Sequence, residues 1–205
     1  MASVPTTPPS RQARLLAAAI AFLALAALGV QPSLGEGTLL ENAGGLVRFF
    51  TIWGNIAAAV IMGCIALGRP VSTPVMAALA TMLTVIALVY WGLLAADHHP
   101  VGLDRITNQV FHTIVPLAVI GWWLRFTPPA PAILPLVPVI MAPPLAYGLF
   151  AFVLGELTGF YAYFFLDLPQ LGWAQFLLSN LVLAVFFAVL GAGLVALKNV
   201  ASRYI

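Results

Sequence analysis

The stretch "VRFFTIWGNIAAAVIMGCIAL", residues 47–67, is an apolar run with polar side chains near its start. About 20 consecutive apolar residues cross the hydrocarbon core of a bilayer as a helix. The whole chain is 62% hydrophobic and 7% charged, whereas about a quarter of the residues of a soluble domain are charged. A chain this apolar cannot cover itself with polar surface, so we expect an integral membrane protein.

Long, continuous apolar runs favour helices over barrel strands, because barrel strands alternate apolar and polar residues. We therefore expect an all-α fold, a polytopic membrane bundle of six transmembrane helices within one domain, 13–197. A Pro/Thr/Ser-rich disordered tail, 1–12, precedes it and a short tail, 198–205, follows. The predicted spans are 13–31, 47–67, 75–95, 107–125, 132–153 and 173–197.

The charged residues divide between the two sets of helix ends. One set holds six basic residues, and the other holds two basic residues with all six acids. Basic residues favour the cytoplasm, so this division places both termini inside, as an even number of spans requires. The Ala/Leu/Gly/Pro-rich composition suggests a bacterial chain, and hence the plasma (bacterial inner) membrane. No basic cluster indicates a nucleic-acid partner.

The first span has two interpretations. Arg11 and Arg14 precede a moderately long apolar core, as in a signal peptide, and "ALA" at 24–26 resembles a cleavage site. That tripeptide lies inside the apolar run rather than after it, which favours an uncleaved span. The single cysteine, Cys64, lies inside an apolar run and is expected to be a small core residue.

Polar side chains reach one depth on three helices that run inward from the outer face. At 1.5 Å per residue, Thr51 in the second span and His112 in the fourth lie roughly 8 Å below the outer ends of their spans. Spacings of three or four residues place each set on one helical face. The sets are Arg48, Thr51 and Asn55; Asp104, Asn108 and His112; and Ser179 with Asn180.

Each of these residues also has a purely structural explanation. A threonine in a membrane helix commonly bonds the carbonyl four residues earlier. Asn55 and Asn180 could join helices, and Arg48 could extend to the interface. An ionisable group inside a span is costly, so His112 is the residue that points most directly to a function.

Metal and cofactor sites are not expected. A bis-histidine haem needs two axial imidazoles, and His112 is alone within the predicted spans. Asp97, His98 and His99 share an outer loop without a metal-binding frame such as C-x-x-C or H-E-x-x-H. Another outer loop, 155–173, is rich in aromatic residues that suit the membrane interface and could cap a cavity.

Three stretches, "RFFTIWGN", "NQVFHTIVP" and "LTGFYAYFFLD", together resemble the androgen-induced-gene family of membrane proteins. That family includes the androgen-dependent regulator of tissue factor pathway inhibitor and many bacterial relatives. The resemblance covers roughly residues 45–197. It implies a multi-pass threonine hydrolase that cleaves fatty acid esters of hydroxy fatty acids, with Thr51 as nucleophile and His112 as base. Ala162 and Phe164 stand where relatives have prolines.

Other polar residues receive roles in this hypothesis. Asn55 and Asn180 are candidates to stabilise an oxyanion, and Asn108 or Glu156 to orient the base. Arg48 would hold a lipid carboxylate at the headgroup level. The expected partners are a lipid ester substrate and membrane lipids. A transporter or lipid-binding protein without covalent catalysis remains the alternative, and a scaffold is a third.

Overall fold

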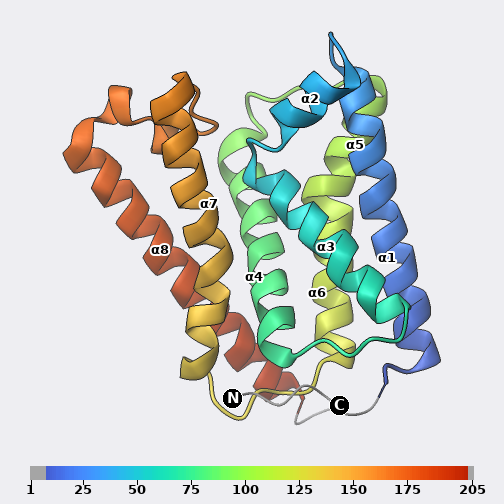
Figure 1. The fold of residues 1–205 in the computed structure, drawn as a ribbon. Helices are drawn as coiled ribbons and strands as arrows, with labels where there is room; N and C mark the ends of the chain where they lie inside the picture. Colours follow the sequence, from blue (N-terminus) through green and yellow to red (C-terminus); the bar gives the residue numbers. More distant parts are fainter. Residues whose placement is uncertain (1–7, 203–205) are drawn as a thin grey trace.

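The computed structural model describes residues 8–202. Within them every regular element is a helix, and the helices lie side by side as one bundle (Figure 1). The eight α-helices are α1 (Arg11–Val30), α2 (Leu39–Leu46), α3 (Phe50–Ala66), α4 (Thr73–Val89), α5 (Gly102–Gln109), α6 (Val115–Phe126), α7 (Val137–Thr158) and α8 (Leu168–Ala201). One π turn, Tyr90–Leu94, follows α4. A second π turn, Val110–Ile114, joins α5 to α6.

Four helical segments are long and apolar enough to cross a membrane: Arg11–Leu34, Thr73–Leu94, Leu134–Thr158 and Leu168–Ala201. The pair α2 and α3, bent by 98°, makes a fifth if it is counted as one span. The helix over the predicted span 107–125 is not among them, because its first half carries polar residues such as Asn108 and Gln109. The chain is thus an all-helical protein with four or five candidate spans.

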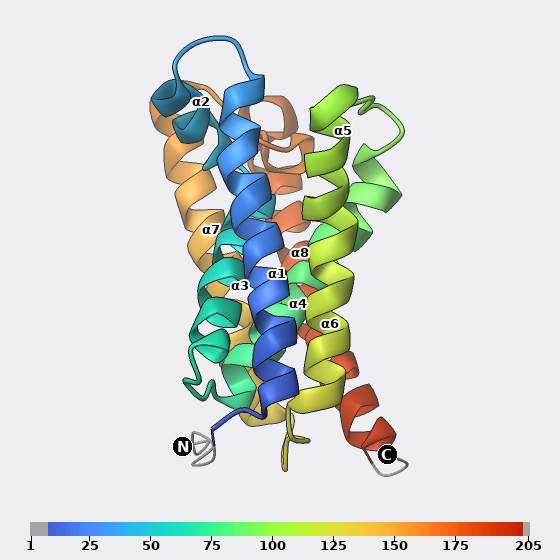
Figure 2. The same cartoon turned by 90° about the vertical axis from the view of Figure 1, so that its right-hand side faces the viewer.

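Alanines let α1 pack closely on its neighbours. In Figure 2, α1 stands between α3 and α6, and its buried residues include Ala13, Ala17, Ala21 and Ala24. Small side chains let helix backbones approach in a membrane, where packing rather than water exclusion drives association. The indole of Trp122 donates to the carbonyl of Ala13 at 2.9 Å, which ties α6 to the first turn of α1.

Glycine allows α8 to cross α7 and α4 at short range. A Cβ on Gly191 would lie 2.7 Å from Cγ2 of Ile140 and 3.1 Å from Oγ1 of Thr81. From this contact α8 runs obliquely past α7 and away from α4 (Figure 1). The bundle is therefore tight at one end and opens towards the other.

The helix boundaries differ from the predicted spans by a few residues. Ser10 caps α1 by accepting from the backbone N–H of Ala13, so the helix includes Arg11 and Gln12 of the predicted tail. Residues 1–7 of that tail and 203–205 of the other lie outside the described residues. α8 extends to Ala201, and Cys64 is half-buried rather than fully in the core.

The two ends of the bundle carry different charges. Arg14 donates to the carbonyl of Ala66, and Lys198 to that of Leu124, at the end where α1 begins and α8 ends. We call this the basic end. The opposite end, called the acidic end, consists of loops, short helices and helix ends that carry the carboxylates of Glu36, Glu41, Asp97, Asp104, Glu156 and Asp167.

Candidate active site

Thr51 and His112 meet near the acidic end of the bundle. The Thr51 Oγ1 lies 3.2 Å from Nε2 of His112, within hydrogen-bond distance. Thr51 is in the first turn of α3 and His112 in the π turn between α5 and α6, and both side chains are half-buried. The two side chains that the sequence placed at one depth therefore touch.

Pro116 accounts for the π turn that carries His112. Proline has no N–H, so the carbonyl of His112 lacks its usual partner four residues ahead. The backbone instead closes a wider turn, in which the N–H of Val115 reaches the carbonyl of Val110. Such turns occur frequently at functional sites because they change the direction of a side chain without ending the helix.

The hydrogen bonds of the imidazole fix its tautomer. Nδ1 of His112 lies 3.1 Å from the backbone carbonyl oxygen of Asn108. A carbonyl oxygen only accepts hydrogen bonds, so Nδ1 carries the proton and Nε2 of the neutral ring is an acceptor. The Thr51 hydroxyl consequently donates to Nε2, which is the arrangement that a nucleophile and its general base require.

Tyr90 forms a wall of the site. Its ring stacks on the His112 imidazole, with centroids 3.9 Å apart and planes 19° from parallel. The Tyr90 hydroxyl accepts from Nδ2 of Asn108 at 2.6 Å and lies 3.2 Å from Nδ1 of His98. Asn108 thus holds the histidine through its carbonyl and the tyrosine through its side chain, and both Asn108 and Tyr90 are buried.

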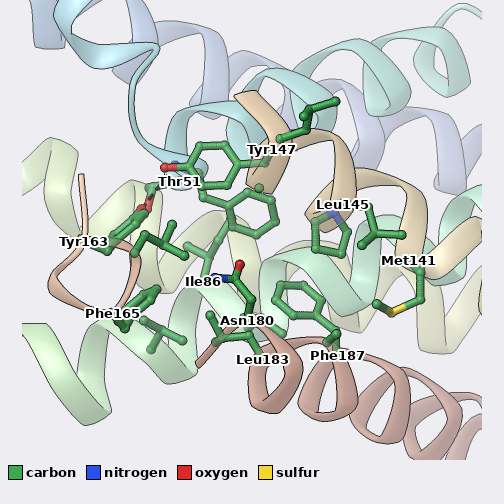
Figure 3. A pocket seen from close by; sticks show the side chains of 18 of the residues that line it. Thr51, Ile86, Met141, Leu145, Tyr147, Tyr163, Phe165, Asn180, Leu183 and Phe187 are labelled. Carbon is green, nitrogen blue, oxygen red and sulfur yellow. Dashed lines mark hydrogen bonds between the residues drawn. The ribbon is translucent and has the colours of Figure 1, made fainter. Parts of the chain in front are cut away.

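Thr51 also lies at the N-terminus of a helix. Backbone N–H groups in the first turn have no carbonyl within the helix to bind, and the helix dipole favours negative charge there. Tyr163, from the loop between α7 and α8, directs its hydroxyl at this terminus and accepts from the N–H of Phe50 at 3.1 Å. Figure 3 shows the Tyr163 ring beside Thr51.

An apolar cavity of about 240 Å³ begins at Thr51 and extends between α4, α7 and α8. Thr51, Tyr147 and Tyr163 lie at one end of it and Met141 and Leu145 towards the other (Figure 3). This is the region where α8 diverges from α4. Its lining also includes Ile86, Leu183 and Phe187, which are apolar, and the polar side chain of Asn180.

The predicted position of Arg48 is wrong. The chain turns by 98° between α2 and α3, and α3 begins at Phe50, so Arg48 precedes the helix rather than sharing a face with Thr51. Its guanidinium lies 4.9 Å from the centroid of the Phe160 ring and lines a separate cavity. Its backbone carbonyl accepts from the hydroxyl of Tyr147 at 2.8 Å, which joins the turn to α7.

Asn55 is not placed to stabilise an oxyanion. Its side chain is fully buried, and Nδ2 donates to the carbonyls of Thr51 at 2.9 Å and Phe111 at 3.3 Å. It does not line the cavity. Asn55 instead joins α3 to the π turn of His112, and so supports the distance between Thr51 and His112.

Of the other predicted residues, Asn108 and Asn180 lie at the site, whereas Glu156 and Ser179 do not. Glu156 is exposed, and its carboxylate accepts from the Tyr161 hydroxyl at 2.7 Å and raises the pKa of Tyr161 to about 12, so it does not orient His112. Asn108 does, but through its backbone carbonyl. Asn180 projects into the cavity (Figure 3) while its Nδ2 donates to the carbonyl of Phe176. Ser179 does not line the cavity.

The outer-loop histidines do not combine with acids into a cluster. His98 contacts Tyr90, and His99 is exposed. Among residues 8–202, no three His, Cys, Asp or Glu side chains lie close enough to hold a metal ion.

Sequence reasoning missed the three tyrosines, Tyr90, Tyr147 and Tyr163. Tyrosine near a helix end is ordinary at a membrane interface, so Tyr90 gave no separate signal. Tyr147 lies in the middle of α7, and no spacing in the sequence connected it with Thr51 or His112. Tyr163 belonged to the quoted stretch "LTGFYAYFFLD", but nothing in the sequence distinguished its hydroxyl from that of Tyr161.

Comparisons with known proteins give no relative. No protein-family model, no curated protein and no solved structure matches the chain.

We predict that Asn55→Ala destabilises the protein while Asn180→Ala does not. The first substitution removes a bond between α3 and the π turn of His112, and such a bond contributes about 0.6 kcal/mol in a membrane. The second removes only a bond to the carbonyl of the same helix. Thermal unfolding in detergent measures the difference, and equal midpoints for the two variants would contradict it.

Proposed function

We propose that the chain is an intramembrane lipid-ester hydrolase in which Thr51 is the nucleophile and His112 the general base. The observation that carries this proposal is the 3.2 Å contact between Thr51 Oγ1 and an imidazole nitrogen that accepts, at the head of an apolar cavity. An unassisted threonine hydroxyl is a weak nucleophile, and a base within hydrogen-bond reach is what activates it.

The reaction follows from these contacts. The Thr51 oxygen bonds to the ester carbonyl carbon as its proton passes to Nε2 of His112. The tetrahedral intermediate then collapses, the ester C–O bond breaks, and His112 returns the proton to the leaving alkoxide. Water, activated by His112 in the same way, attacks the acyl-threonine and releases a fatty acid together with the free hydroxyl of Thr51.

The negative charge of the intermediate requires donors fixed in advance. The backbone N–H groups at the start of α3 and the hydroxyl of Tyr163 are the candidates, in place of Asn55. Tyr163 accepts from Phe50, which leaves its own O–H available to donate. The helix dipole favours negative charge at the same position.

The cavity suits an acyl chain. Its walls are mainly aliphatic and aromatic side chains from α4, α7 and α8. The hydroxyls of Thr51, Tyr147 and Tyr163 lie at one end, and the amide of Asn180 is the further polar side chain in its lining. A chain inserted from that end leaves the ester carbonyl at the hydroxyl. Arg48 lines a different cavity, so no contact supports the expected role of binding a carboxylate.

The proposed topology has six spans with both termini cytoplasmic. The bent pair α2–α3 and the helix formed by α5 and α6 would be the second and fourth spans, and the basic end would face the cytoplasm. This topology, the fatty acid ester substrate and the resemblance to the androgen-induced-gene family belong to the proposal. An even number of spans is consistent with α1 beginning and α8 ending at the same end of the bundle.

Purified protein is expected to release fatty acid from a fatty acid ester of a hydroxy fatty acid. Thr51→Ala should abolish turnover, and His112→Ala should lower it by about a hundredfold or more, as loss of a general base does. A fluorophosphonate probe should label wild type at Thr51 and not label Thr51→Ala.

Matched controls are Thr84→Ala and His99→Ala. Thr84 donates to the carbonyl of Ala80, in the ordinary pattern for a membrane threonine, and His99 is exposed. Both should retain wild-type turnover. Full activity in folded Thr51→Ala would contradict the proposal, as would substrate flux into proteoliposomes with no new product, which would indicate a transporter.

Labelling from outside tests the topology. In a Cys64→Ser background, Glu36→Cys should react in intact cells with a reagent that does not cross membranes, since Glu36 lies at the acidic end. Ser202→Cys, at the basic end, should react only after lysis. The reverse pattern, or outside labelling at both positions, would exclude the proposed orientation.

A further inference from the structure

A second cavity lies at the basic end, far along the bundle from Thr51. It has a volume of about 600 Å³ and is formed where α1 begins and where α6 and α8 end. The lining residues that matter here are Trp122, Arg125, Phe126, Thr127 and Lys198. Within the part of the chain that the structure describes, none of its lining residues is acidic.

Two basic side chains line this cavity, and among residues 8–202 no carboxylate lines it with them. Lys198 is only 6% exposed, and its Nζ donates to the carbonyl of Leu124 at 2.5 Å. An ammonium group has three N–H donors, so two are left. Arg125 lines the same cavity, with its guanidinium 5.2 Å from the centroid of the Phe126 ring. A buried ammonium beside another cation is costly unless an anion joins them.

Thr127 supplies an independent sign of a ligand. It is 6% exposed, and its Oγ1 has no hydrogen-bond partner among the residues that the structure describes. Buried hydroxyl groups are nearly always bonded, so this hydroxyl, on a residue that lines the cavity, lacks an acceptor or donor. An anion held by Lys198 and Arg125 would provide the acceptor.

We infer that this cavity binds a phosphate group, most directly that of a phospholipid headgroup. Phosphate offers several acceptor oxygens to a guanidinium, an ammonium and a hydroxyl at once. Basic pockets between transmembrane helices recognise the headgroups of anionic lipids. Trp122, Phe126 and neighbouring prolines provide apolar surface beside the cations, which suits the glycerol and first acyl carbons of a lipid. The inference is independent of the hydrolase proposal.

The test titrates detergent-purified protein with three probes: dihexanoyl-phosphatidylglycerol, inorganic phosphate and dihexanoylglycerol. A ligand that binds the folded state raises the midpoint of thermal unfolding in a saturable way. The phospholipid should do so and dihexanoylglycerol should not. A saturable shift with phosphate of equal affinity would support the phosphate site and assign it to soluble phosphate compounds.

Variants locate the binding. Arg125→Gln and Lys198→Met should each weaken phospholipid affinity at least tenfold, and Arg69→Gln should leave it unchanged. Arg69 is a matched control because it is exposed at the same end but does not line the cavity. Arg125 is exposed, so its variant decides the question even if Lys198→Met does not fold.

The inference is overturned if none of the probes gives a saturable shift, or if dihexanoylglycerol matches the phospholipid. Equal affinity in wild type, Arg125→Gln and Arg69→Gln would also overturn it. Hydrolytic activity does not enter the readout.

Discussion

In a bilayer every backbone N–H and C=O must find a partner within the protein. The candidate site of this chain depends on one position where the usual helical hydrogen bond cannot form. Pro116 cannot donate to the carbonyl one turn before it, and the helix widens into a π turn. The wider turn carries His112, whose Nδ1 meets the carbonyl of Asn108. That contact determines which ring nitrogen remains free, and the free nitrogen meets Thr51.

The packing of the bundle places a cavity at the same position. Gly191 lets α8 contact α7 and α4 closely, and beyond that contact α8 diverges. Space therefore opens between α4, α7 and α8 rather than between α1 and α3, where alanines bring the helices together. Tyr163 and the aromatic loop reach over the end of this space, so Thr51 is bordered by a polar cluster on one side and an apolar cavity on the other.

Much of the fold was predictable, because long apolar runs leave few alternatives in lipid. All six predicted spans are helical, within a few residues of their expected limits, although four or five are long and apolar enough to cross. The depth calculated from the rise per residue of a helix also placed Thr51 and His112 at one level. The same calculation gave a wrong position for Arg48, because it assumes a straight helix and the chain bends by 98° just before Phe50.

The direction in which each side chain points could not be predicted from the sequence. Asn55 shares a helical face with Thr51 but turns its amide to Phe111, because an unsatisfied carbonyl of the π turn lies there. Tyr90 and Tyr163 come from a neighbouring helix and a loop, and only tertiary packing brings them to the site. Sequence spacing gives the depth of a residue in the membrane, whereas the partner of its side chain depends on how the helices are rotated.

The most direct test of the account is the protonation pattern of His112, measured by ¹⁵N NMR on histidine-labelled protein. With His98→Gln and His99→Gln, the one remaining native imidazole is assigned without ambiguity. The account predicts a neutral ring with the proton on Nδ1, and an Nε2 resonance that shifts when Thr51 is replaced by valine. A proton on Nε2, or an Nε2 resonance indifferent to that replacement, would contradict it.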